Sequence, residues 1–412
     1  METQAINRSE AKRKLATVQK IKSINPIPNA DAIEVVEVLG WKVVVKKDEV
    51  KVGQKVVYFE IDSLLPDVPQ YEFLGKPRVN PITVGTDAEE VGHPLKTAKL
   101  RGQISQGLVQ TFESLPTDFS GLSRAAFLTL LENAPIGADV TKLLNVSKWD
   151  KPESVSAIGT LVGGFPSHLT PKTDEERVQG QPVDLEKMKG EAYVGSEKLD
   201  GTSVTVTFDP ETKEILFASR NYQLADDNKI RDFLEVTGTL ERIMNFTEGR
   251  LVLQSEFYGV GIQDNRVGIR GNRLSTFNIA VDGVRQSLLR SIEIAHELGL
   301  ELPDIVRLGV PKEHELELLN AVKALNRDRK KVNLQVEDRI TSGPKPLIMA
   351  KNSGHLFNAT SDELVEDVSD EVYPSTNRAI EGIVYRPVFE TDNFNPISFK
   401  VINNKFLIKH KL

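Results

Sequence analysis

One lysine in this sequence lies where an amine could attack phosphorus. Lys198 opens a Lys-x-Asp-Gly run that ends at Gly201, between the strand-like stretches EAYVG and SVTVTF. Lysine has a reference pKa of about 10.4 and is normally protonated, so burial or a nearby cation must lower that pKa before the amine can attack. We therefore predict a sheet-lined pocket around Lys198, a lowered lysine pKa and a phosphoramidate intermediate. A charged turn between two strands is the alternative for this tetrapeptide alone.

Five further elements follow the lysine in order and carry side chains suited to phosphates and nucleotides. They are Ser219-Arg220-Asn221, Glu256-Phe257-Tyr258-Gly259, Phe277-Asn278-Ile279, Glu381-Gly382-Ile383-Val384-Tyr385 and Ser398-Phe399-Lys400-Val401. With the lysine run they resemble the collinear motifs I, Ia, III, IIIa, IV and V of the covalent nucleotidyltransferases. This superfamily contains DNA ligases, RNA ligases and mRNA capping enzymes, and the resemblance covers residues 172–409.

The resemblance implies that the first motifs form a site for ATP. Lys198 would attack the α-phosphorus of ATP and carry AMP, and Glu197 would lie at the mouth of the adenosine pocket. Arg220 would grip a phosphate, because its planar fork suits phosphate oxygens. Asp200 is assigned with Arg220 to the contact with phosphate or nucleic acid.

The later motifs would complete the site. Glu256 would accept hydrogen bonds from the ribose hydroxyls, and Phe277 would stack on adenine. Glu381 would bind the catalytic Mg²⁺ or Mn²⁺, directly or through water, because such cations prefer oxygen ligands. Lys400 would be the second catalytic residue, placed on the α-phosphate to neutralise developing charge.

The region before the lysine is predicted to be a separate β-rich domain. Short β-branched runs such as AIEVVEVLG and QKVVYFEI alternate with turn residues, which favours a small barrel or sandwich. Residues 25–31, 99–102 and 105–107 resemble the OB-fold tRNA-binding module. A barrel that acts only as a spacer is the alternative to one that binds nucleic acid.

These elements predict an α+β protein. We expect an OB-fold-like β-barrel over residues 1–147, a linker rich in Pro, Gly, Ser and Thr over residues 148–182, and a nucleotidyltransferase domain over residues 183–412. The last would be an α+β adenylyltransferase domain with an ATP-grasp-like ligase fold. In it, the runs SLLRSIEIAHELG and EHELELLNAVKALNRD have helical spacing and mix with strand-like stretches.

The order of the domains favours one branch of the superfamily. Lys400 is followed by only twelve of the 412 residues, so the barrel that follows motif V in the usual DNA ligases and capping enzymes would not fit there. A barrel in front resembles the Deinococcus-type RNA ligases, as do residues 58–63, 172–179 and 398–403. Thr202 stands near where some RNA ligases place an asparagine, and extra length is expected at residues 75–94 and 311–370.

This resemblance implies an ATP-dependent RNA ligase. It would join 3′-hydroxyl and 5′-phosphate ends through lysyl-AMP and AMP-capped nucleic acid, at nicks in RNA or RNA/DNA duplexes. Two other interpretations stay open: a DNA ligase of unusual domain order, and a non-catalytic RNA-binding OB protein.

Composition sets outer limits on the function. The sequence has no cysteine, which excludes disulfides and thiolate metal sites. It has no run of about 18 apolar residues and no secretory signal, so we expect a cytoplasmic monomer that does not enter a membrane. The net charge of −7 does not itself indicate nucleic-acid binding, and a local basic groove would have to supply it.

Overall fold

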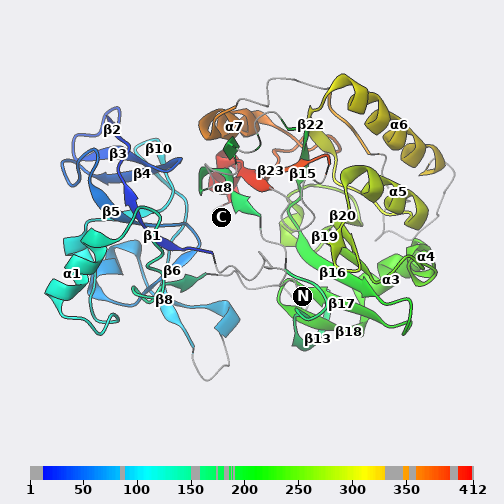
Figure 1. Ribbon diagram of the computed structural model, residues 1–412, viewed down its shortest axis with the longest axis horizontal. Helices are drawn as coiled ribbons and strands as arrows, with labels where there is room; N and C mark the ends of the chain where they lie inside the picture. Colours follow the sequence, from blue (N-terminus) through cyan, green and yellow to red (C-terminus); the bar gives the residue numbers. More distant parts are fainter. Residues whose placement is uncertain are drawn as a thin grey trace, which may run out of the picture. The chain divides into compact units, whose positions relative to one another are not determined.

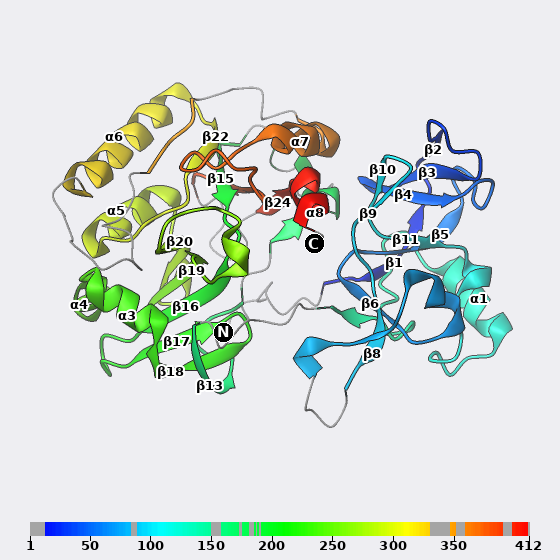
Figure 2. The same cartoon turned by 180° about the vertical axis from the view of Figure 1, so that it is seen from behind.

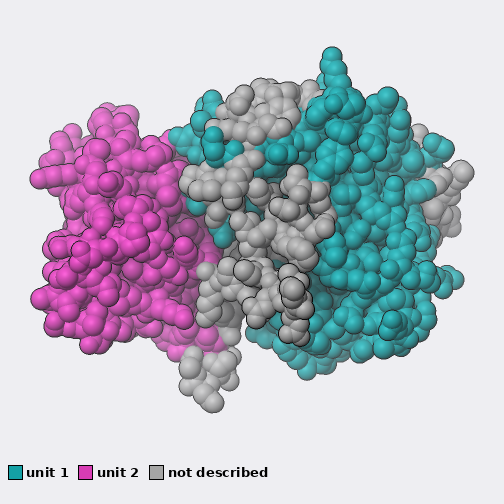
Figure 3. Space-filling model, viewed as in Figure 1, with its two compact units in different colours: residues 1–11, 153–406 teal, residues 12–152, 407–412 magenta. Residues whose placement is uncertain are grey.

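The computed structural model divides the chain into two compact units (Figure 3). It describes residues 13–83, 89–149, 158–172, 175–180, 185–186, 188, 191–329, 347–351, 359–389 and 398–410. The smaller unit comprises residues 12–152 and 407–412, and the larger comprises residues 1–11 and 153–406. Parts of the predicted linker (150–157, 173–174, 181–182) and of the predicted insertions (84–88, 330–346, 352–358) lie outside the described residues.

The smaller unit is built from short antiparallel strands and one helix. The strands are β1 (Ala16–Lys20), β2 (Ser23–Pro26), β3 (Ile33–Val38), β4 (Trp41–Lys46), β5 (Lys55–Phe59), β6 (Ser63–Pro66), β7 (Arg78–Val79), β8 (Val91–Pro94), β9 (Ala98–Leu100), β10 (Gln103–Ser105), β11 (Leu108–Gln110) and β12 (Ser147–Lys148), and the helix is α1 (Arg124–Asn133). They form the sheets β1-β5-β11, β2-β3-β4, β9-β10 and β12-β6-β8-β7.

Side-chain alternation explains the core of the smaller unit. Along β4 the residues are in turn more and less buried, as expected of a strand with one face on the core. Trp41 at its start lies 6.2 Å from the ring of Tyr58 on β5. Gly107 has a φ of +103°, and a Cβ there would lie 2.4 Å from a Tyr58 ring carbon, so glycine is required.

The larger unit contains two sheets that share no strand. The seven-stranded sheet has the order β13-β18-β17-β16-β19-β20-β21, and the five-stranded sheet the order β14-β24-β23-β15-β22. Their bounds are β13 (Gly159–Gly164), β14 (Glu176–Arg177), β15 (Tyr193–Lys198), β16 (Thr202–Phe208), β17 (Ile215–Ser219), β18 (Tyr222–Asn228), β19 (Leu251–Gly259), β20 (Asn272–Val281), β21 (Val284–Arg285), β22 (Ile305–Gly309), β23 (Gly382–Pro387) and β24 (Phe399–Ile402).

The larger unit also contains helices. They are α3 (Lys229–Val236), α4 (Thr239–Met244), α5 (Leu288–Leu298), α6 (Lys312–Arg329) and α7 (Ser361–Asp367), and α8 (Asn404–His410) ends the described chain. Figures 1 and 2 show α3 to α6 next to one another along one side of the unit. The two runs predicted as helices are confirmed as α5 and α6.

Helix α5 shows why its sequence folds as predicted. The Ser287 side chain caps its first turn by accepting a hydrogen bond from the Arg290 N–H, and Gly299 ends it with a left-handed φ of 70°.

No helix in the described ranges is long and apolar enough to span a bilayer.

One short connection joins the two sheets. Strand β15 lies in the five-stranded sheet and β16 in the seven-stranded sheet, so residues 199–201 carry the chain from one sheet to the other. Lys198 is the last residue of β15 and therefore lies at this crossing.

Candidate active site

The amine of Lys198 is held by a carboxylate. Its Nζ donates a hydrogen bond to Oε2 of Glu381 over 2.8 Å, and the two side chains are 28% and 15% exposed. Glu381 immediately precedes β23, whose Gly382 pairs with Lys198. The sheet register thus brings together two residues that are 183 positions apart in the sequence.

Tyr373 fixes the backbones of these two residues. Its buried hydroxyl donates to the carbonyl of Lys198 over 3.0 Å and accepts from the N–H of Glu381 over 3.2 Å. A rigid ring therefore sets the separation between the backbones of Lys198 and Glu381. Sequence reasoning missed Tyr373, because no motif marks it.

Two more carboxylates surround the lysine. Burial raises the pKa of Glu256, on β19, to about 8; Lys198 opposes this shift, and the charges of Glu381 and Asp200 add to it. Burial also raises the pKa of Asp200 to about 6, together with the charge of Glu381 and against the effect of Arg266. Burial is the main cause of both shifts, and the neighbouring carboxylates add to it.

The prediction of a lowered lysine pKa is wrong for the free protein. Burial lowers the pKa of Lys198, but Glu381, Glu256 and Asp200 together outweigh that effect and raise the pKa above its ordinary value. The three carboxylates stabilise the ammonium form. A positive charge placed near these carboxylates would weaken their hold on the proton and lower the lysine pKa.

Asp200 is paired with a residue that sequence reasoning missed. Arg266 Nη1 donates to both carboxylate oxygens of Asp200, over 3.1 and 3.0 Å, and both side chains are nearly buried. Asp200 was expected to contact phosphate or nucleic acid. A buried carboxylate already bound to a guanidinium fits a positioning role instead, because its charge would repel a phosphate.

An unusual turn aims Arg266 at Asp200. The three preceding residues, Gln263, Asp264 and Asn265, have left-handed φ values of 43°, 58° and 48°. Each such residue is strained by roughly 1–2 kcal/mol, so the surrounding contacts must hold the turn in place. One of them is the hydrogen bond from Arg378 to the Asn265 carbonyl, over 3.2 Å.

Replacing Arg266 by lysine is expected to slow self-adenylylation about tenfold, because an ammonium cannot replace the planar guanidinium that holds both oxygens of Asp200. The rate of label transfer from ATP to the protein measures this. Arg270→Lys, on an exposed residue of the same loop, is the matched control. Equal rates for Arg266→Lys and Arg270→Lys would show that the pair with Asp200 has no part in the reaction.

Gly201 is required by close packing at the crossing between the sheets. A Cβ at this position would lie 2.5 Å from the Phe257 carbonyl oxygen and 2.9 Å from Cβ of Tyr258. Real Cβ atoms do not approach backbone so closely, so only glycine lets the chain reach β16 beside β19. Close packing thus explains why the Lys-x-Asp-Gly run ends in glycine.

An open pocket brings most of the predicted site residues together. It encloses about 700 Å³ including its mouth, a size suited to a small ligand. Six of the eight predicted residues line it: Glu197, Lys198, Arg220, Glu256, Phe277 and Lys400. Glu381 joins them through its ion pair with Lys198, and Asp200 through its charge.

Both sheets contribute walls to this pocket. Lys198 and Lys400 come from the five-stranded sheet, where Lys400 pairs with Val384, another lining residue. Glu256 and Phe277 come from the seven-stranded sheet. Basic side chains from one sheet and an aromatic side chain from the other therefore line the same pocket.

Phe277 is presented by a β-bulge. In the pairing of β19 with β20, Gln254 lies opposite Asn278 and Ser255 opposite Thr276, which leaves Phe277 without a partner position. A bulge bends the strand and redirects the extra side chain. Here that side chain lines the pocket.

Glu197 lies deeper than predicted. Its side chain is 2% exposed, and its Oε1 accepts a hydrogen bond from the N–H of Asp304 over 3.2 Å. It was expected at the mouth of the adenosine pocket. Because β15 is covered on both edges by β23 and β22, the residue before Lys198 is instead buried in the pocket wall.

Two family models match this sequence. An OB-fold domain model matches residues 15–112, and an RNA ligase model matches residues 191–402, which is just over half of the chain. The molecule is therefore an α+β enzyme with an N-terminal OB-fold domain and an ATP-binding nucleotidyltransferase domain, as predicted. The chain belongs to the RNA ligase family.

Solved structures agree with this assignment. A lysine-to-methionine mutant of Naegleria gruberi RNA ligase with AMP and Mn is 29% identical to this chain, with a TM-score of 0.68, over 97% of this chain and 99% of that chain. A glutamate-to-alanine mutant with AMP and Mn has 30% identity, the same TM-score and the same coverage. The Naegleria gruberi enzyme with PPi has 30% identity and a TM-score of 0.66. No curated protein gives a significant sequence match.

Proposed function

We propose that this RNA ligase is of the Deinococcus type and seals 3′-hydroxyl and 5′-phosphate ends at nicks in RNA or RNA/DNA duplexes, using ATP. One observation carries the proposal: the amine of Lys198 lies in the same pocket as Arg220, Phe277 and Lys400, 2.8 Å from the carboxylate of Glu381. An amine, two further cations and an aromatic ring in one pocket suit transfer of a nucleotide.

Lysyl-AMP formation follows from this arrangement. The Lys198 ammonium loses a proton, its nitrogen attacks the α-phosphorus of ATP, and the bond from that phosphorus to the pyrophosphate oxygen breaks. Lys400 and Arg220 would neutralise the phosphate charge during the step. Phe277 would stack on adenine, and Glu256 would accept hydrogen bonds from the ribose hydroxyls.

The carboxylates also suit a divalent cation. Glu381, Glu256 and Asp200 gather negative charge around Lys198, and oxygen ligands are those that Mg²⁺ and Mn²⁺ prefer. Within the described part of the chain no three such side chains lie close enough to coordinate one ion together. Glu381 would therefore hold it alone or through water. Its charge would help the lysine lose its proton.

Two further transfers complete the proposed cycle. The 5′-phosphate attacks the phosphorus of lysyl-AMP, which breaks the N–P bond and caps the strand with AMP. The 3′-hydroxyl then attacks the capped 5′-phosphate and releases AMP. Lys198 acts as nucleophile only in the first transfer, so the three steps are separable by experiment.

The test combines label transfer with sealing. The protein is incubated with radiolabelled ATP and Mg²⁺ and then with nicked duplexes that carry ribose or deoxyribose at each side of the break. We expect label on denatured protein, and sealing that requires ribose on the 3′-hydroxyl side. Equal sealing of all-DNA nicks would favour a DNA ligase, and absence of label would refute the proposal.

A further inference from the structure

Phe277 lies between two pockets, so its ring needs a fixed support. A second pocket adjoins the first and encloses about 760 Å³ including its mouth. Phe277 and Arg386 line both pockets. A half-buried ring on a bulge, with open space on two sides, could turn out of the first pocket unless another group holds it.

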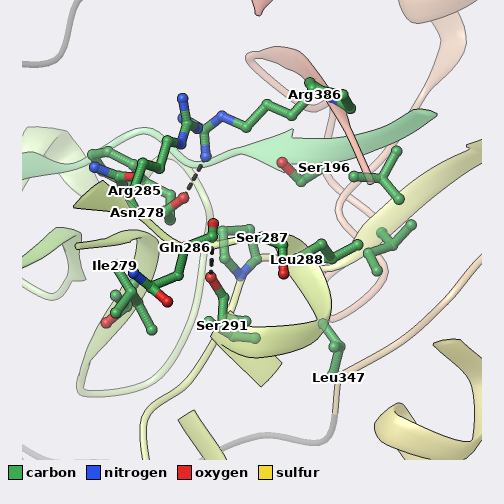
Figure 4. A pocket seen from close by; sticks show the side chains of 17 residues that line it. Ser196, Asn278, Ile279, Arg285, Gln286, Ser287, Leu288, Ser291, Leu347 and Arg386 are labelled. Atoms are coloured by element: carbon green, nitrogen blue, oxygen red, sulfur yellow. Dashed lines mark hydrogen bonds between the residues drawn. The ribbon is translucent and has the colours of Figure 1, made fainter. Parts of the chain in front are cut away.

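Arg386 makes two contacts with Phe277. Its Nη1 donates a hydrogen bond to the carbonyl oxygen of Phe277 (Figure 4). Its guanidinium carbon also lies 5.7 Å from the centre of the phenyl ring, within the range of a cation–π contact. One side chain from β23 thus restrains both the backbone of the bulge and the ring that the bulge presents.

Glu175 holds Arg386 in turn, and Ser398 holds Glu175. Its Nη2 and Nε donate to Oε1 of Glu175 over 2.7 and 3.3 Å, and Ser398 donates to the other carboxylate oxygen. The side chains of Arg386 and Glu175 are 14% and 17% exposed. Burial alone would raise the pKa of Glu175, but Arg386 and Arg285 outweigh it and hold that pKa below its ordinary value, so the pair stays ionised.

We propose that Arg386 is a positioning residue, which holds Phe277 as the stacking surface for the adenine of ATP. Glu175 holds Arg386, and Ser398 holds Glu175. The inference rests on the proposed adenylylation of Lys198. In the proposed site the phosphates of ATP are assigned to Arg220 and Lys400, and Arg386 is assigned to the support of Phe277. Loss of the clamp should therefore weaken recognition of the base and spare recognition of the phosphates.

The test measures label transfer to Arg386→Met and Arg386→Lys across a range of ATP concentrations. Lysine keeps the charge but cannot bond Glu175 and the Phe277 carbonyl at once. For both variants we expect the KM for ATP to rise about tenfold, the scale of one weakened base–aromatic stack, with kcat within about threefold of the wild type. The Kd of pyrophosphate, which has no base, should not change.

Two further variants separate positioning from general damage. Arg250→Met removes an ion pair with Asp209 over 3.1 Å, away from the pocket lining, and should leave the KM unchanged. Glu175→Gln keeps the size of the clamp's anchor and should raise the KM in the same direction as the Arg386 variants.

Three outcomes decide the matter. An unchanged KM in both Arg386 variants overturns the inference. A parallel loss of pyrophosphate binding and thermal stability also overturns it, because the arginine would then serve the fold alone. A wild-type protein that takes no label refutes the proposed adenylylation itself.

Discussion

Lys198→Ala is expected to abolish labelling of the protein by radioactive ATP. The variant lacks the amine whose nitrogen would form the bond to phosphorus, and with it the hydrogen bond to Glu381. Loss of a covalent nucleophile typically costs more than about 10³-fold in rate. Gel analysis of denatured protein after incubation with ATP and Mg²⁺ measures the effect.

The control for this variant is Lys229→Ala, on an exposed residue at the start of α3, which should label as the wild type does. Lys198→Ala should still join a nick whose 5′-phosphate already carries AMP, because the last transfer needs no lysine nucleophile. Label that persists on Lys198→Ala would assign the chemistry to another residue.

Glu256→Gln is expected to make the free protein more stable and less active. The folded-state pKa of Glu256 is about 8, against an ordinary value of 4.5. A carboxyl group whose pKa rises on folding contributes fully to the stability of the fold when the pH is below its unfolded-state pKa. That contribution is lost as the pH rises toward the folded-state pKa of about 8. Glutamine carries no charge, so the variant avoids the loss.

The gain should be about 1–3 kcal/mol in the free energy of unfolding at pH 8 and should shrink toward pH 5. Urea unfolding at both pH values measures it, and Glu214→Gln, on an exposed residue of the same unit, should show no such trend. Adenylylation measured above pH 8, where Glu256 is ionised, should fall about tenfold, because the ribose then loses a charged acceptor. A variant less stable than the wild type at pH 8 would contradict this account.

Short sequence motifs were enough to predict the residues at the centre of the site. Lys198 ends a strand, Gly201 must be small where the chain crosses between sheets, and Glu381 precedes a strand that pairs with β15. Each of these three residues belongs to a short motif that can be recognised in the sequence. The order of these motifs was informative because it resembles that of the covalent nucleotidyltransferases.

The partners of these residues could not be predicted in the same way. Tyr373 is 175 positions from Lys198, and Arg266 is 66 positions from Asp200, and nothing in either segment specifies the pairing. The bulge at Phe277 depends on the register between two strands. The sign of the Lys198 pKa shift depends on carboxylates from separate segments, so it was predicted wrongly.

The crossing at residues 199–201 has a consequence for how substrate binding and folding are linked. The proposed ligand would touch Lys198 and Lys400 on one sheet and Glu256 and Phe277 on the other. Once AMP is attached to the lysine, it would link the two sheets in addition to the connection at residues 199–201 and the contact of Arg386 with Phe277. Occupancy of the pocket would then be reported by slower amide exchange in both layers, and the adenylylated form would be the mechanically stiffer state of the enzyme.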